Sequence, residues 1–252
     1  MTHPAIQVPA VIAHRGYSVA APENTLAAVR AAHQAGATWV ELDVQLLGDG
    51  TPVIWHDASV TRCSSGRGNL RDLSWEKARI LDAGSWFGDH FAGEKMASLE
   101  AMISLLNELE MGVNMEFKVN RGRDPIALVD RALPEMLDTL PPERLIISSF
   151  NASALSHCRQ FASRERLALG LLFGSIPKTW RAQCEAIEAF SVHADWSRLK
   201  RPQAAAIQRD GYHLMCYTAN DPSAFHNRWA WGISSVITDE PAAFKRYLDS
   251  HS

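Results

Sequence analysis

Short, mainly apolar runs alternate with longer amphipathic stretches along most of the chain. Short apolar runs, here of three to seven residues, between turn signals are typical of strands that are buried on both faces. The longer stretches repeat their apolar residues at helical spacing. The predicted strands are 11–13, 39–44, 52–55, 112–117, 145–149, 167–173, 190–194, 212–217 and 235–237, and the predicted helices are 24–35, 99–110, 125–139, 151–161, 177–189, 202–210 and 221–229.

This alternation predicts an α/β fold with a parallel sheet. About eight strands in 252 residues favour a TIM (β/α)8 barrel over an open doubly wound sheet. A chain of this length can also form two small domains, but barrels of this size are commonly single units, so we expect one domain over residues 1–252. Neither G-x-G-x-x-G nor G-x-x-x-x-G-K-[ST] occurs, which removes the usual nucleotide-binding motifs.

The segment from about 57 to 98 interrupts the alternation of strands and helices, because it is far longer than an ordinary connection between a strand and a helix. It is rich in Gly, Ser, Arg and Asp and contains Trp75, Trp86, Phe87 and Phe91. A disordered insertion would leave these aromatic side chains in water. We therefore expect a small cap, inserted after the third strand, that lies over the barrel's C-terminal mouth, with Trp86 and Phe87 as candidate pocket residues.

Composition and charge mainly exclude functions. The chain is 46% hydrophobic and 21% charged, and its net charge of −3 gives no broad basic surface for nucleic acid or an anionic membrane. Four scattered cysteines without CxxC spacing fit free thiols in a reducing compartment. The N-terminus does not resemble a signal peptide and no 18-residue apolar run occurs, so we expect a cytoplasmic protein without stable membrane association.

Acidic residues occur within two of the predicted strands. Glu41 and Asp43 stand two residues apart, so both carboxylates point to the same face of their strand. Two acids inside a barrel would repel each other and lose hydration, and a cation would offset that cost; a solvated surface pair is the alternative. Glu116 adds a third carboxylate unless it only pairs with Lys118. Three carboxylates without cysteine suit Mg²⁺ or Ca²⁺ better than Zn²⁺.

Two histidines, His14 and His56, each end a predicted strand. One alone could be a buried, hydrogen-bonded core group, but two at matching strand ends suggest a pair that transfers protons as base and acid. Arg15, with its planar fork, and Lys118, with its point charge, are the candidate phosphate ligands. Phosphodiester cleavage needs this combination, because one proton leaves the attacking oxygen, another reaches the departing alkoxide, and cations stabilise the charge on the phosphoryl oxygens.

Several neighbouring residues have supporting roles in this hypothesis. Gly16 would let the backbone approach a ligand. Glu23 is expected to support the site through a hydrogen bond, and Asn24 is the candidate N-cap of the first helix. Asp57 could orient an imidazole or cap a turn. His193 ends a predicted strand and could border the pocket.

These residues, in this order, resemble the glycerophosphodiester phosphodiesterase family, and the similarity spans about residues 10–241. The motifs that carry it are His14-Arg15-Gly16, Pro22-Glu23-Asn24-Thr25, Glu41-x-Asp43, Pro52-Val53-Ile54-Trp55-His56-Asp57, Leu81-Asp82-Ala83-Gly84-Ser85-Trp86-Phe87, Glu116-x-Lys118 and Thr238-Asp239-x-Pro241. The chain, which lacks a recognisable signal, resembles the cytosolic bacterial members. The resemblance implies a TIM barrel that hydrolyses glycerophosphodiesters to sn-glycerol 3-phosphate and an alcohol. Glycerophosphocholine and glycerophosphoethanolamine are substrates of this kind.

The resemblance also implies roles for the residues already named. The three carboxylates would hold a divalent metal, the two histidines would form the acid/base pair, and Arg15 and Lys118 would contact phosphate. Whether water or the substrate's own glycerol hydroxyl attacks is open. Tyr217 stands where the family commonly has Trp, and Phe150 and Tyr217 are further candidates for the substrate pocket.

Two other functions stay open at this point. One is a phosphodiesterase on the same barrel that is directed at lysophospholipid or sphingomyelin, and the other is a non-catalytic barrel that only binds phosphoesters. The lack of a secretion signal and of a basic or apolar membrane patch argues against the first. The presence of all three carboxylates and both histidines argues against the second. We expect a small glycerophosphodiester as the partner and no nucleic acid.

Overall fold

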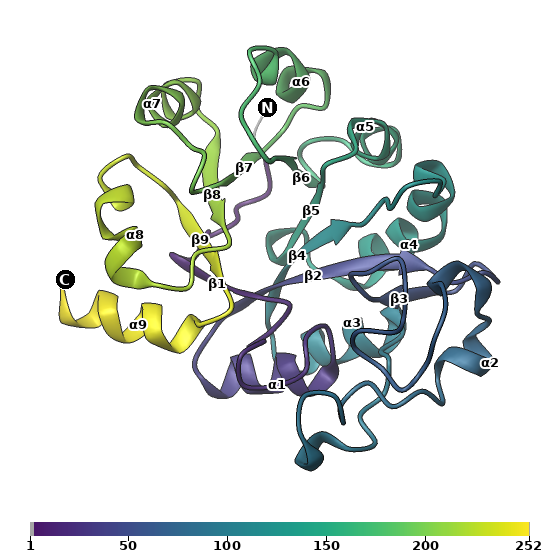
Figure 1. The fold of residues 1–252 in the computed structure, drawn as a ribbon. Coiled ribbons are helices and arrows are strands. Elements are labelled where there is room, and N and C mark those ends of the chain that lie inside the picture. Colours follow the sequence, from purple (N-terminus) through teal and green to yellow (C-terminus); the bar gives the residue numbers. More distant parts are fainter. Residues whose placement is uncertain (1–2, 252) are drawn as a thin grey trace.

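The computed structural model describes residues 3–251, and eight parallel strands form a closed ring in it (Figure 1). The pairing of β9 with β1 and of β1 with β2 closes the ring. The predicted TIM barrel is therefore confirmed. In order around the ring, the strands are β1 (Val11–His14), β2 (Trp39–Leu46), β4 (Gly112–Phe117), β5 (Leu145–Ser149), β6 (Ala168–Phe173), β7 (Ser191–Asp195), β8 (His213–Tyr217) and β9 (Ser235–Thr238).

Helices surround the ring and cover the outer faces of the strands (Figure 1). They are α1 (Leu26–Gln34), α3 (Leu99–Glu108), α4 (Pro125–Thr139), α5 (Ala152–Phe161), α6 (Trp180–Ala186), α7 (Arg201–Arg209), α8 (Pro222–Trp229) and α9 (Pro241–Ser250), with a short 3-10 turn, η3 (Pro142–Arg144), before β5. Each except α9 matches an expected helix. The helix α9, which buries Pro241 and Phe244, was not predicted, although its apolar residues do recur at helical spacing.

The third predicted strand is not part of the ring. β3 (Pro52–Ile54) runs antiparallel to β2, with Val44 opposite Ile54 and Leu46 opposite Pro52. The strand β2 continues past the end of β4, and the chain then turns back along it. The expectation that 52–55 is a barrel strand ending at His56 is therefore wrong, because a short apolar run does not reveal the direction in which it pairs.

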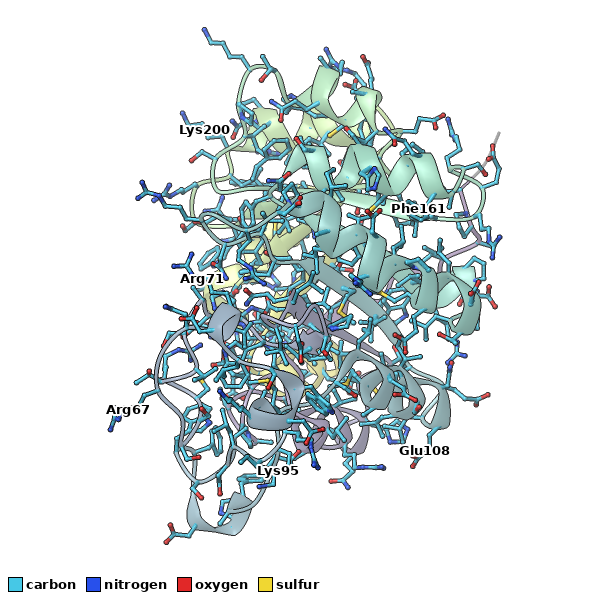
Figure 2. All side chains as sticks on the ribbon, turned by 90° about the vertical axis from the view of Figure 1, so that its right-hand side faces the viewer. Arg67, Arg71, Lys95, Glu108, Phe161 and Lys200 are labelled. Carbon is cyan, nitrogen blue, oxygen red and sulfur yellow. The ribbon has the colours of Figure 1, made fainter. Side chains whose placement is uncertain are left out.

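Residues 57–98 form a small unit on one side of the barrel (Figures 1 and 2), with Arg67 at its outer surface. Its regular elements are short: η1 (Leu70–Asp72), α2 (Trp75–Ala78) and η2 (Asp89–Phe91). This insertion has its own apolar core, which the β2–β3 hairpin joins. The core consists of Leu47, Val53, Trp55, Val60, Cys63, Leu70, Ala78, Ala83 and Met96.

Alternate residues of the ring strands point into the barrel, and large apolar side chains fill its amino-terminal half. They are Ile12, Trp39, Ile146, Phe190, Met215 and Ile237. Trp39 crosses the interior against Gly112, where a Cβ atom would lie 2.1 Å from Cε2 of the indole. The polar side chains further along the same strands therefore gather at the carboxyl-terminal mouth. Within residues 3–251, none of the helices has the length and apolarity needed to cross a bilayer.

Candidate active site

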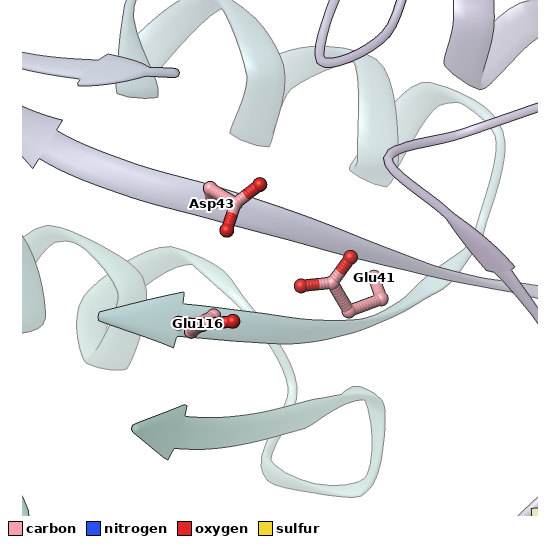
Figure 3. A group of neighbouring side chains, drawn as sticks. All are labelled: Glu41, Asp43 and Glu116. Atoms are coloured by element: carbon pink, nitrogen blue, oxygen red, sulfur yellow. The ribbon is translucent and has the colours of Figure 1, made fainter. Parts of the chain in front are cut away.

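Three carboxylates converge inside the mouth of the barrel (Figure 3). Glu41 and Asp43 come from β2, and Glu116 lies directly opposite Asp43 on β4. One oxygen atom from each carboxylate lies within 4.8 Å of the others. The three side chains are buried, with exposures of 4%, 1% and 7%. The structure thus brings together the acids that the sequence singled out as metal ligands.

Burial and crowding perturb the pKa values of this acidic cluster. Burial, followed by the charges of Asp43 and Glu116, raises the pKa of Glu41 well above its usual range. Burial and the charge of Asp43 likewise raise the pKa of Glu116 to about 7. Burial would also raise the pKa of Asp43, but the charges of Lys118 and Arg15 outweigh it and hold that pKa well below its usual range. Protons or a cation must balance the remaining negative charge.

The donor atoms of the acidic cluster fit a hard divalent cation. All three ligands are carboxylates, which is the chemistry that Mg²⁺ and Ca²⁺ prefer. Three protein ligands would leave coordination positions for phosphate oxygens or water. The sequence-based expectation of an oxygen-rich metal site therefore agrees with the side chains present.

Two imidazoles line the cavity above the acidic cluster, and each contacts an aspartate through Nδ1. Nδ1 of His14 lies 2.6 Å from Oδ1 of Asp239, the residue that follows β9. Nδ1 of His56 lies 2.7 Å from Oδ1 of the adjacent Asp57. A carboxylate at this distance favours the tautomer with the proton on Nδ1, which leaves Nε2 of each ring for proton transfer.

His56 reaches this place from the segment after β3 rather than from a ring strand. The Nε2 atom of Gln45, on the overhanging end of β2, lies 2.7, 2.8 and 3.1 Å from the carbonyl oxygens of residues 55, 56 and 57. Oε1 of Gln45 accepts a hydrogen bond of 2.8 Å from Asn120. The hairpin and these two amides therefore fix the backbone at His56.

Two cations flank the acidic cluster. Nζ of Lys118 lies 2.9 Å from Oε1 of Glu116 and 3.3 Å from Oδ1 of Asp43. Nε of Arg15 lies 3.3 Å from Oδ2 of Asp43, and its Nη1 donates to Oε1 of Glu23 at 2.7 Å. Glu23 thus has the supporting hydrogen bond expected of it. Both cations line the cavity, where they can meet an anionic ligand.

Two neighbours differ from the sequence-based expectation. Thr25, not Asn24, caps α1 by accepting the N–H of Ala28. Asn24 has a φ of 58°, and its amide instead donates to Oδ2 of Asp43 and accepts from the backbone N–H of Asp43. Gly16 faces α1 rather than a ligand, since a Cβ atom there would lie 2.6 Å from the backbone carbon of Ala28.

The cavity has a volume of about 280 Å³. Phe150 and Tyr217 form part of its wall, with ring centroids 6.0 Å apart in an edge-to-face arrangement. Trp86 and Phe87 pack against each other in the insertion and do not line the cavity, so the expectation that they border the pocket is wrong. His193 does not line it either, because its side chain is fully buried inside the ring next to Ser191.

Asp239 is the main site residue for which the sequence predicted no role. Besides His14, its carboxylate contacts Nδ2 of Asn220 at 2.7 Å and Oγ of Ser18 at 2.8 Å. An acid immediately after a strand was the available signal, and it lies within a motif of the family resemblance. Its partner could not be deduced, since the linear sequence does not say that β9 lies beside β1.

The closed barrel and its charged mouth define a TIM-barrel enzyme whose active site lies at the carboxyl ends of the strands. Comparison with known proteins makes this class specific. The model of the "Glycerophosphoryl diester phosphodiesterase family" matches residues 14–243. The chain therefore belongs to this family and is a phosphodiesterase, as the sequence resemblance implied.

Similar proteins cover nearly the whole chain. The glycerophosphodiester phosphodiesterase of Caldanaerobacter subterraneus subsp. tengcongensis is 33% identical over 92% of this chain and 94% of its own length. A phosphodiesterase of Oleispira antarctica, solved with the product sn-glycerol-3-phosphate, superposes with a TM-score of 0.92 at 33% identity, over 96% of this chain and 97% of the other. The Thermotoga maritima glycerophosphodiester phosphodiesterase superposes with a TM-score of 0.76 at 26% identity, over 95% and 98%.

Proposed function

We propose that this phosphodiesterase hydrolyses small glycerophosphodiesters, such as glycerophosphocholine and glycerophosphoethanolamine, to sn-glycerol 3-phosphate and an alcohol in a reaction that needs a divalent metal. The observation that carries the proposal is that one cavity is lined by Glu41 and Glu116 of the acidic cluster, by both imidazoles and by both cations, with Asp43 buried directly beside them. The Oleispira antarctica structure supports the choice of product, because that protein binds sn-glycerol-3-phosphate.

The charged residues of the site have different roles. Glu41, Asp43 and Glu116 would hold a divalent metal, which when bound would supply Lewis acidity to the phosphoryl oxygens and lower the pKa of the attacking hydroxyl. Arg15 and Lys118 bind phosphoryl oxygens and stabilise the charge that develops on them. Both cations also contact Asp43 of the acidic cluster, so they would bind the phosphate next to the place where these carboxylates would hold the metal.

The two histidines move the protons. One imidazole accepts a proton from the attacking water or glycerol hydroxyl, and the other donates a proton to the departing alkoxide. The contacts with Asp239 and Asp57 orient the rings so that Nε2 carries out this exchange. Burial lowers the pKa of His56, even though the charge of Asp43 opposes this, so its ring is neutral near pH 7 and able to accept a proton.

The size and lining of the cavity favour a small substrate. Its volume is about 280 Å³. A glycerol phosphate joined to a short alcohol would have charged side chains at its phosphate and Phe150 and Tyr217 beside its organic groups. A sphingomyelin or lysophospholipid would have to leave its acyl chain outside the cavity. The structure therefore gives no support to the lipid-directed alternative.

A coupled assay for sn-glycerol 3-phosphate tests the proposal. Glycerophosphocholine and glycerophosphoethanolamine are compared in this assay after EDTA treatment and after addition of Mg²⁺, Ca²⁺ or Mn²⁺. Lysophosphatidylcholine and sphingomyelin would leave a phosphorylated lipid instead of sn-glycerol 3-phosphate, so their turnover is followed in parallel by the choline that they release. We expect metal-dependent turnover of the two glycerophosphodiesters. Turnover that survives EDTA would contradict metal dependence, and ligand binding without product release would indicate the non-catalytic barrel.

Single variants in the same assay test the histidines. His14→Ala and His56→Ala are each expected to lower kcat by about 100- to 10,000-fold, because each removes a proton-transfer group. His33→Ala, on the exposed side of α1, is the matched control and should retain normal turnover. Near-normal kcat in either of the first two variants would contradict the assignment of that histidine.

A further inference from the structure

Arg62, in the insertion, bridges two acidic residues that support different parts of the site. Its Nε donates to Oδ2 of Asp57 at 2.7 Å, and its Nη2 donates to Oδ1 at 2.9 Å. On its other edge, Nη1 donates to Oε2 of Glu23 at 2.7 Å, and Nη2 donates to Oε1 at 2.8 Å. A single guanidinium thus makes four hydrogen bonds to two carboxylates.

Each of these carboxylates has a second partner inside the cavity. Oδ1 of Asp57 lies 2.7 Å from Nδ1 of His56, and Oε1 of Glu23 accepts from Nη1 of Arg15 at 2.7 Å. Arg62 is therefore linked through Asp57 to the imidazole of His56 and through Glu23 to the guanidinium of Arg15. These contacts form a continuous chain of charge-assisted hydrogen bonds.

The same guanidinium keeps both carboxylates ionised. The hydrogen bonds from Arg62 are the largest cause of the low pKa of Asp57, which falls to about 2. Burial would raise the pKa of Glu23, but the hydrogen bonds from Arg62 and the charge of Arg15 outweigh it and lower that pKa. Only an ionised carboxylate can accept hydrogen bonds from two partners in this way.

The position of Arg62 indicates a role beyond holding the insertion together. Its side chain is 46% exposed, and no residue of 57–98 lines the cavity. An exposed ion pair contributes little to stability by itself. The planar guanidinium of an arginine, hydrogen-bonded to two carboxylates at once, does fix their orientation. The flexible ammonium group of a lysine cannot do this. The next residue, Cys63, belongs to the insertion's apolar core and anchors the backbone there.

We propose that Arg62 is a positioning residue for the reaction, which holds the His56 ring through Asp57 and the Arg15 fork through Glu23 in the orientations that meet the phosphate. The insertion thereby contributes to catalysis without supplying any part of the cavity wall. This inference rests on the roles proposed above for His56 and Arg15.

Kinetics of three arginine variants test the inference. Arg62→Gln should lower kcat by about 10- to 100-fold with a smaller change in KM, as is typical when a group that orients a reacting residue is lost. Arg62→Lys should recover only part of this loss, because an ammonium group cannot span two carboxylates. Arg79→Gln removes another exposed arginine of the insertion, which pairs with Glu76, and should leave kcat unchanged.

Chemical rescue separates positioning from a purely structural role. Adding millimolar guanidinium to Arg62→Ala should restore part of the lost kcat, and the same concentration of sodium chloride should not. A folded Arg62→Gln or Arg62→Lys enzyme with kcat within twofold of the unmutated enzyme would overturn the inference, as would equal losses in Arg62→Gln and Arg79→Gln. His56→Ala is measured in parallel, since normal turnover in that variant would refute the proposed function rather than the role of Arg62.

Discussion

The carboxylate of Asp239 shows how much of the site depends on a single residue. It contacts His14, Asn220 and Ser18. Burial would raise the pKa of Asp239, but its hydrogen bonds, above all with His14, lower it to about 2. At neutral pH the group is therefore a full negative charge beside Nδ1 of His14, which fixes both the tautomer and the orientation of the ring.

Replacement of Asp239 by Asn tests the orientation of the His14 ring while leaving the imidazole itself in place. The amide keeps the shape but can present N–H to Nδ1, which favours the wrong tautomer, so we expect kcat to fall by about 100-fold or more with little change in KM. Steady-state kinetics on glycerophosphocholine measure the effect. The control is Asp221→Asn at the N-cap of α8, where Asn caps as well as Asp, and its kcat should match that of the unmutated enzyme. A normal kcat in Asp239→Asn would contradict the orienting role.

At the level of single residues, the sequence identified those whose position follows from spacing alone. Glu41 and Asp43 alternate within one strand, and that period places them on one face without any knowledge of the fold. Asn24 was assigned to a helix cap, because the long-range partner that takes its amide, Asp43, is not visible in the local sequence. Asp239 had no assigned role for the same reason.

At the level of elements, β2 carries more of the site than any other strand. It supplies Glu41 and Asp43 to the acidic cluster and then continues beyond the ring, where Gln45 holds the backbone of residues 55–57. The antiparallel return of β3 brings His56 back to the mouth. The site therefore needs the hairpin as much as it needs the ring.

Gln45→Glu tests the part that the hairpin plays. The substitution replaces a buried amide N–H donor with a carboxylate oxygen, which can only accept, beside three carbonyl oxygens. We therefore expect the free energy of unfolding to fall by about 1–3 kcal/mol and kcat to fall as well. Urea unfolding and steady-state kinetics measure the two effects. Gln208→Glu, on the exposed side of α7, is the matched change and should cost less than about 0.5 kcal/mol. Equal stability of the two variants would show that Gln45 does not hold the segment.

The pattern of apolar residues predicted the ring strands and most helices, since burial on both faces of a parallel strand leaves a clear signal. It missed α9, whose buried side consists of Pro241 and Phe244. It also placed β3 in the ring, because the period of a strand does not reveal its pairing direction. Trp86 and Phe87 were expected at the pocket, but the sequence cannot tell an aromatic pair at a cavity from one within an insertion.

For the whole molecule, the acidic cluster should couple the proposed metal binding to folding. Without a cation, the folded state holds the Glu116 proton more tightly than the unfolded state does, since burial raises the pKa to about 7 from an ordinary value of 4.5. Between these two values the folded protein binds more protons, so its stability falls as the pH rises. A divalent cation bound by these carboxylates would displace the proton and remove this penalty.

The rise in Tm on adding Mg²⁺ or Ca²⁺ should therefore be larger at pH 8 than at pH 5. Differential scanning calorimetry with EDTA or with the metal, at several pH values, measures it. In Glu116→Gln the cluster has one charge fewer, so the metal-free protein should lose less stability with rising pH and the metal should raise Tm less. A metal-induced shift that is the same at pH 5 and pH 8 would contradict the coupling.

The contact between His14 and Asp239 joins residues that are 225 positions apart in the chain. While a ribosome is making this protein, the carboxylates of the acidic cluster on β2 and β4 emerge long before β9 does. Until β9 has been synthesised and has closed the ring, His14 has no acid to orient it. Hydrolytic competence should thus arrive only after residue 239 has been made, and chains that stall before it should not turn over substrate.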